Sequence, residues 1–159
     1  MAKITTNQSR SHDIFLPPPH PAQFEAESQM KRFNLLRCGR RWGKDVSQMR
    51  RIIKIALSSR KPVAWYAPTY RMLQENWREI SSYLEPVIQR SRESEHRLDL
   101  ITGAPIDFWS LENPESSRGR KYYHVAINEA ALVRELRMLW NTVIRPTLAD
   151  WAGTADFGS

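Results

Sequence analysis

The feature that most constrains this sequence is a glycine- and lysine-bearing loop between an apolar segment and an amphipathic stretch. The loop runs from Arg37 to Asp45 and reads RCGRRWGKD. Residues 33–37, FNLLR, predict a short buried strand before it. From 45 to 58 apolar residues recur every three or four positions, which predicts an amphipathic helix after it. A strand–loop–helix unit with Gly-Lys at the end of its loop is typical of sites that hold phosphate groups.

The loop matches the phosphate-binding pattern G-x-x-x-x-G-K-[ST] only in part. Gly43 and Lys44 occupy the Gly-Lys positions, so Gly43 allows close backbone approach and Lys44 offers a positive charge to β- and γ-phosphates. Cys38 stands where the first glycine is expected, with Gly39 one place later. Asp45 replaces the Ser or Thr whose hydroxyl normally reaches magnesium.

The rest of the chain alternates strand and helix patterns. Strands are expected at 62–68, at 124–128 and, as an opening strand, at 153–159; a hairpin is expected at 96–102 and 106–111. Helices are expected from Pro21, over 73–84 and over 132–143, the last ending before Pro146. This alternation predicts an α/β fold with a mostly parallel sheet. We expect a flexible arm at 1–13 and one domain at 14–159, cut off by the chain end.

The amino-acid composition limits the class of binding partner but does not identify the partner. The 159 residues carry a net charge of +7, and positions 31–61 hold eleven Lys or Arg against one acid, Asp45. Such a field attracts polyanions such as nucleotide phosphates or nucleic acid, although a solvated basic face is as compatible with charge alone. The sequence shows no signal-like or membrane-spanning run, and its single cysteine with four histidines lacks metal-ligand spacing.

Three further segments carry groups suited to nucleotide chemistry. An apolar strand at 123–127 ends in Asn128 and Glu129, where the usual pair is an acid that holds magnesium and a second acid that polarises the attacking water. Gln23, in a proline-rich segment, has an amide that matches the adenine edge. Arg118, in the sequence SRGR, could reach a γ-phosphate in its own subunit or a neighbour's.

In this order, these segments resemble the ATPase domain of the large terminase subunit of tailed bacteriophages. The matching stretches are HPAQ at 20–23, GRRWGK at 39–44, APTY at 67–70 with Trp77 on the next helix, SRGR at 117–120, NEA at 128–130 and IRPTL at 144–148. The resemblance covers about residues 12–159. It implies a P-loop NTPase of the ASCE type, a three-layer sandwich, and a subunit ring that drives double-stranded DNA into a procapsid by ATP hydrolysis.

The resemblance also implies roles for individual residues. Gln23 would read adenine, Arg40 would sense the γ-phosphate in cis, Glu129 would be the catalytic base, and Arg118 would act in trans. Lys44 would bind the phosphates within a nucleotide-binding set that comprises Gln23, Cys38, Gly39, Arg40, Arg41, Trp42, Gly43, Lys44, Asp45 and Val46. Implied partners are ATP, Mg²⁺, a portal protein and a small terminase subunit, with no membrane, in the cytoplasm of the bacterial host. The family's nuclease domain is absent from these residues.

Asp45 and Asn128 are interpreted together. The usual site pairs a neutral hydroxyl on the loop with a carboxylate at the strand tip. Here the carboxylate would have moved to the loop, with Asp45 ligating magnesium and Asn128 bonding a coordinated water; oxygen ligands suit magnesium in either arrangement.

Two other functions remain open on the sequence. One is a nucleotide- or DNA-binding module with little hydrolysis of its own, because an arginine from a neighbour can be worth about 10³ to 10⁵ in rate. The other is a helicase-like DNA translocase, which also combines such a glutamine with an acidic strand.

Overall fold

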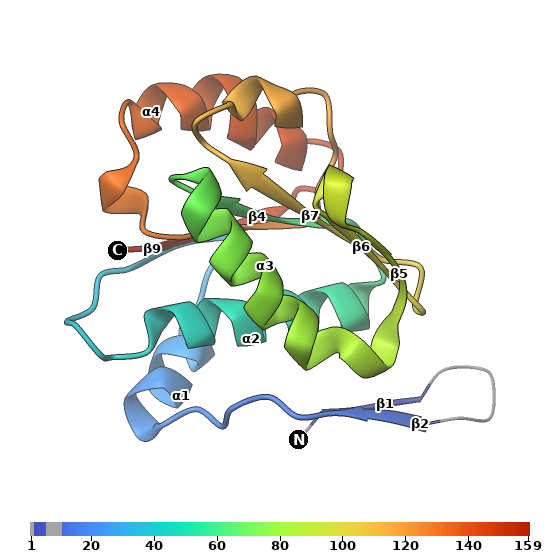
Figure 1. The fold of residues 1–159 in the computed structure, drawn as a ribbon. Helices are drawn as coiled ribbons and strands as arrows, with labels where there is room; N and C mark the ends of the chain where they lie inside the picture. The colour runs from blue at the N-terminus through green and yellow to red at the C-terminus, as the bar shows by residue number, and fades with distance from the viewer. Residues whose placement is uncertain (1, 6–10) are drawn as a thin grey trace.

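A computed structural model of the protein describes residues 2–5 and 11–159. Its centre is a seven-stranded sheet with the order β3-β9-β8-β4-β7-β6-β5 (Figure 1). The strands of this sheet are β3 (Phe33–Leu36), β4 (Val63–Ala67), β5 (Ile88–Arg92), β6 (Arg97–Leu100), β7 (Pro105–Ser110), β8 (His124–Ile127) and β9 (Thr154–Gly158). The helices are α1 (Pro21–Ser28), α2 (Lys44–Ser59), α3 (Tyr70–Leu84) and α4 (Leu136–Leu139), joined by shorter turns.

The sheet is mostly parallel, as predicted. Strands β3, β9, β8, β4 and β7 run parallel to their neighbours, whereas β5 and β6 are antiparallel additions at one edge. The expected hairpin over 96–111 is the β6–β7 pair. Because parallel strands present their carboxyl ends at one edge of a sheet, the loops after β3 and β8 come together there.

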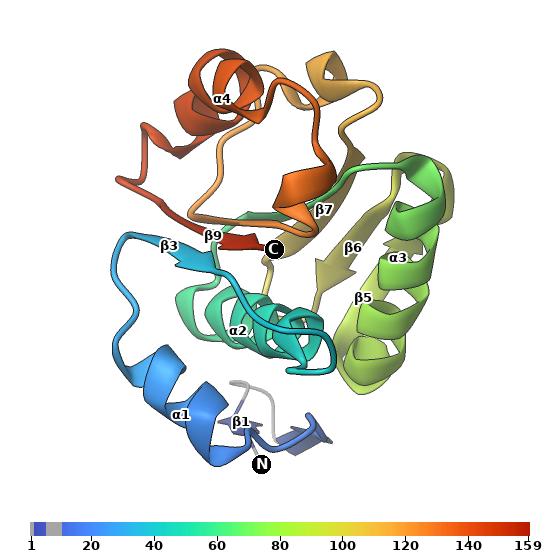
Figure 2. The ribbon, with the colours of Figure 1, turned by 90° about the vertical axis from the view of Figure 1, so that its left-hand side faces the viewer.

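Helices cover both faces of the sheet (Figure 2). Helices α2 and α3 pack on one face, and α4 with the turns that follow it packs on the other. Side chains of β4 alternate between the two cores, Trp65 toward α2 and α3 and Tyr66 toward the opposite layer, and every residue of β4 is buried. Burial on both faces explains the continuous apolar run that predicted this strand. The predicted α3 stripe, Leu73, Trp77, Ile80 and Leu84, is entirely buried.

The N-terminal segment lies outside α2, next to α1 (Figure 1). A loose arm is expected there, but β1 (Ala2–Thr5) pairs antiparallel with β2 (Ser11–Ile14), and Ile14 joins the core under α2 and α3. Local composition does not predict this hairpin, because its anchor is a tertiary contact. The part of the expected arm at residues 1 and 6–10 lies outside the described residues.

Two expected elements differ from the structure. Strand β3 is not buried as predicted: it is the outer strand, and Leu35 is 68% exposed. The helix expected over 132–143 begins only at Leu136, and the chain goes on through a π-helical turn, 140–144, into a 3-10 turn that includes Pro146. Proline is accepted there because the first residues of a turn need no N–H partner. None of the described helices is both long and apolar enough to cross a membrane.

Candidate active site

The loop after β3 closes into a turn directly before α2. The N–H of Trp42 donates to the carbonyl of Gly39 at 3.2 Å, and Gly43 caps α2 with a left-handed backbone at φ 79°. A side chain at this position would be strained by the backbone angle. Its Cβ would also lie 2.7 Å from Nε2 of Gln23. Glycine is therefore required at position 43 by both conformation and space.

Lys44 and Glu129 meet at the carboxyl edge of the sheet. Lys44 is the first residue of α2, and Glu129 is the second residue after β8. The Lys44 ammonium donates to Oε1 of Glu129 at 2.6 Å. Partial burial opposes the charge of Lys44, but the hydrogen bond to Glu129 and the charges of Asp45 and Glu129 outweigh it and raise the pKa of this lysine. The lysine is therefore cationic at neutral pH. The structure brings together the two charged residues that the sequence assigns to phosphate binding and to catalysis.

Asp45 and Asn128 are the sequence neighbours of Lys44 and Glu129, respectively, and each has an oxygen without a hydrogen-bond donor among the described residues. Asp45 Oδ1 is 3.7 Å from the Lys44 ammonium, and burial raises the pKa of the Asp45 carboxyl, opposed by the charge of Lys44. Asn128 is 2% exposed, and its amide donates weakly to Oδ1 of Asn76 at 3.5 Å. A buried amide oxygen and a carboxylate oxygen without donors fit a hard cation that takes its remaining ligands from phosphates and water.

The described residues contain no cluster of three or more His, Cys, Asp or Glu side chains that could hold a metal ion. A cation at this edge would therefore depend on a nucleotide for several of its ligands, as magnesium does in phosphate-transfer sites.

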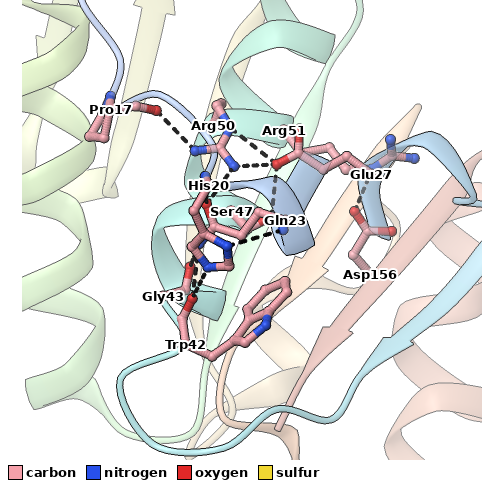
Figure 3. A network of polar contacts seen from close by, with 10 residues as sticks. All are labelled: Pro17, His20, Gln23, Glu27, Trp42, Gly43, Ser47, Arg50, Arg51 and Asp156. Atoms are coloured by element: carbon pink, nitrogen blue, oxygen red, sulfur yellow. Dashed lines mark hydrogen bonds and ion pairs between the residues drawn. The ribbon is translucent and has the colours of Figure 1, made fainter. Parts of the chain in front are cut away.

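The Gln23 side chain contacts the backbone of the loop between β3 and α2 (Figure 3). Its side-chain amide donates to the carbonyls of Trp42, at 3.0 Å, and Gly43, at 3.1 Å. Its Oε1 accepts from Arg50 Nη2 at 3.2 Å and from the backbone N–H of His20 at 3.4 Å. Two donors and two lone pairs are thereby used, which is the full capacity of the group. The structure thus directs this amide to the loop and leaves it no free edge for adenine.

The remaining residues of the loop that the sequence assigns to nucleotide binding are more exposed to solvent. Arg40 and Arg41 are exposed, and Cys38 is half-buried, with burial raising the pKa of its thiol against the effect of Lys44. The Trp42 ring packs edge-on against His20, with centroids 5.3 Å apart.

Arg118 is not brought to the Lys44–Glu129 pair. It follows the 3-10 turn at Pro114–Ser117, is exposed, and donates to Glu115 Oε1 at 2.9 Å.

Sequence periodicity misplaces two basic residues of α2. The apolar period over 45–58 leaves Arg50, Arg51 and Lys54 on other faces of the helix, where they would be solvated or would touch DNA. In the structure Arg50 is 2% exposed and contacts Glu27, and Arg51 Nε lies 2.6 Å from Asp156 Oδ2 (Figure 3). Both form ion pairs with acids from distant elements, α1 and β9. Only Lys54 of this set is exposed. A signal for Glu27 does exist in the sequence, because it lies four residues after Gln23 and so on the same face of α1.

The fold is that of large terminase ATPase domains. The structure is similar to the large terminase ATPase domain of Thermus phage P74-26 (TM-score 0.76, 20% identity, 89% of this chain and 64% of that one). It is also similar to the large terminase of bacteriophage HK97 (TM-score 0.70, 11% identity, 87% and 32%). A third similar structure is the large terminase of a thermophilic bacteriophage in complex with ATP-γ-S (TM-score 0.62, 13% identity, 80% and 32%).

The chain spans about two thirds of the Thermus phage domain and one third of the other two. No protein-family profile and no curated protein sequence matches it. The predicted architecture, with helices on both faces of a mostly parallel sheet, is confirmed.

Proposed function

We propose that this chain binds ATP between the loop at 39–46 and Glu129, and that it forms the ATPase part of a motor that packages double-stranded DNA into a viral procapsid. The observation that carries the proposal is the 2.6 Å contact between Lys44 and Glu129. The contact joins an ammonium and a carboxylate at the carboxyl edge of the sheet, beside the N-terminus of a 16-residue helix, where anions bind. This supports Lys44 as the phosphate-binding cation and Glu129 as the general base. Two of the similar structures, from HK97 and the thermophilic phage, are of large terminases, and the latter contains an ATP analogue.

Each residue has a role in this proposal. The loop N–H groups and Lys44 hold the phosphates, Arg40 senses the γ-phosphate from the same subunit, and Glu129 orients and deprotonates the attacking water. Asp45 and Asn128 offer oxygens to Mg²⁺, which supplies positive charge to the phosphate oxygens when bound. The free oxygens of Asp45 and Asn128 support this assignment.

Titration of ATP, with and without magnesium, tests the site. The lysine charge is a main source of phosphate affinity, so Lys44→Ala should weaken ATP binding at least about 100-fold. Lys54→Ala is the matched control, because it removes the same charge from an exposed position on the same helix. Equal affinities in Lys44→Ala and Lys54→Ala would exclude the loop as the nucleotide site.

A binding module with little hydrolysis of its own is the second candidate. It is favoured by the position of Arg118, which is exposed and paired with Glu115 rather than directed at Lys44 and Glu129.

If Arg118 acts in trans within a ring, hydrolysis per chain should rise with protein concentration, or with DNA, portal protein and small terminase subunit. Arg118→Ala should abolish that rise and leave ATP affinity unchanged; Arg71→Ala, another exposed arginine in a local ion pair, is the control. Binding without turnover under all of these conditions would favour the module.

A further inference from the structure

Helix α1 is joined to the phosphate loop and to α2 by a network of polar contacts, most of them partly buried (Figure 3). Arg50 is at its centre: Nε donates to Glu27 Oε1 at 3.1 Å, Nη1 to the carbonyl of Pro17 at 2.9 Å, and Nη2 to Gln23 Oε1 at 3.2 Å. Ser47 Oγ also donates to Glu27 Oε1, at 2.9 Å. A guanidinium with three separately satisfied nitrogens has little freedom to move. Arg50 and Glu27 therefore fix the position of the Gln23 carbonyl oxygen.

The orientation of the Gln23 amide follows from its partners. Arg50 and the His20 N–H can only donate, so they must face Oε1, while the carbonyls of Trp42 and Gly43 can only accept, so they must face Nε2. His20 adds to the same arrangement. Its Nδ1 accepts from the Gln23 backbone N–H at 3.4 Å, which leaves Nε2–H to donate to the Trp42 carbonyl at 3.0 Å. No flipped amide would satisfy these groups.

Holding two loop carbonyls also orients two loop N–H groups. In a trans peptide the N–H points opposite to the C=O of the same peptide plane. The carbonyls of Trp42 and Gly43 accept from Gln23, and the Gly43 carbonyl also accepts from the Ser47 N–H at 3.0 Å, so the N–H groups of Gly43 and Lys44 point away from the Gln23 amide. As amides at the start of α2 they have no partner within the helix. These are the groups that a phosphate would take as donors.

We propose that Gln23 is a positioning residue for the phosphate loop, held in place by Arg50 and Glu27, and not a reader of adenine. This inference rests on the proposed nucleotide site and refines it: the contribution of Gln23 acts on the phosphates through the loop. The contribution of Gln23 to affinity is therefore the same for any nucleoside triphosphate and for inorganic tripolyphosphate.

The test compares three ligands, ATP, GTP and tripolyphosphate, each titrated with magnesium into the full chain and into Gln23→Met. Methionine keeps the length and helix preference of glutamine without its hydrogen bonds. Loss of two hydrogen bonds to the loop should weaken all three ligands by the same factor, about tenfold. A loss for ATP with GTP and tripolyphosphate unchanged would overturn the inference and restore adenine recognition. Unchanged affinities for all three ligands would also overturn the inference.

Further variants separate positioning from stability. Gln29→Met makes the same change at an exposed position that ends α1 and should alter no affinity. Ile80→Val lowers the melting temperature from within α3, away from the loop, and should also leave the affinities unchanged. If Gln23→Met does not fold, Glu27→Gln replaces it, since loosening Arg50 should weaken the three ligands equally but less. A full chain that binds none of them contradicts the proposed function itself.

Discussion

The ammonium of Lys44 and the carboxylate of Glu129, 85 positions apart in the chain, lie 2.6 Å from each other. Their side chains are 18% and 27% exposed, so the pair is neither isolated from water nor fully screened by it. In the proposed function, phosphates would take the place of Glu129 beside the lysine. The carboxylate therefore competes with the ligand before it serves in catalysis.

Replacement of Glu129 by glutamine should increase ATP affinity about 2- to 10-fold, because a partly exposed ion pair is worth up to about 1 kcal/mol and no longer has to be broken. Hydrolysis should be lost, since an amide cannot accept the proton of water. Calorimetric titration measures the affinity. Glu135→Gln, at an exposed position after the same strand, controls for net charge. Unchanged or weaker ATP binding in Glu129→Gln would show that the pair does not compete with phosphates.

Asp45→Asn should reduce the dependence of ATP binding on magnesium. Without metal, the variant should bind ATP more tightly than the native chain, because a carboxylate near the phosphates repels them. With metal, this advantage should disappear, so that the affinity ratio with and without Mg²⁺ falls about tenfold. Asp150→Asn, an exposed acid beyond the fourth helix, is the control. If Asp45→Thr raised hydrolysis sharply while Asp45→Asn had no effect, relocation of the magnesium carboxylate to the loop would be wrong.

The two loop glycines should respond differently to a single methyl group. Gly43 has φ at 79° and an added Cβ would approach Gln23, whereas nothing lies within 4 Å of a Cβ at Gly39. A left-handed backbone costs a non-glycine residue about 1–2 kcal/mol, so Gly43→Ala should lose about tenfold in nucleotide affinity. Gly39→Ala should change the affinity less than twofold. Equal losses in the two variants would mean that the loop conformation described here is not the one that binds.

Acid should weaken the fold through His124. Burial and the charge of Arg51 lower the pKa of this histidine from 6.5 to about 3. The unfolded chain therefore binds a proton near pH 6.5 that the folded chain refuses, and this contribution to stability is complete above pH 6.5 and declines as pH falls. Between pH 6.5 and 5, the free energy of unfolding should fall by about 1.6 kcal/mol in total from this group, with a slope that approaches about 1.4 kcal/mol per pH unit at the acid end.

The measurement is denaturant unfolding across that range for the native chain and for His124→Asn, which cannot titrate. Asp156 Oδ2 lies 3.6 Å from the ring, and burial raises the pKa of this carboxyl against the effect of Arg51. Because Asp156 is present in both proteins, the difference between their stability curves isolates the contribution of His124. Parallel stability curves for the two proteins would show that His124 is protonated in the folded state.

The sequence by itself determined the parallel strands of the sheet, the long helices α2 and α3 and the residues of the loop, but not β1, β2 or β5. These follow from local rules: the period of apolar residues, a buried run such as β4, and glycine where the backbone is left-handed. It also placed Glu129 just after a core strand, two residues beyond the end of β8, and the carboxyl ends of parallel strands lie at one edge of the sheet.

Only the tertiary structure decided what the polar side chains of α1 and α2 do. Arg50 and Gln23 look like surface residues in one dimension, because neither periodicity nor charge shows that Glu27 and two loop carbonyls complete their hydrogen bonds. β3 looks buried for the converse reason: its apolar side chains do not show that it is the outer strand. Burial of a polar group depends on partners brought from elsewhere in the chain, and these partners are specified by packing rather than by local pattern.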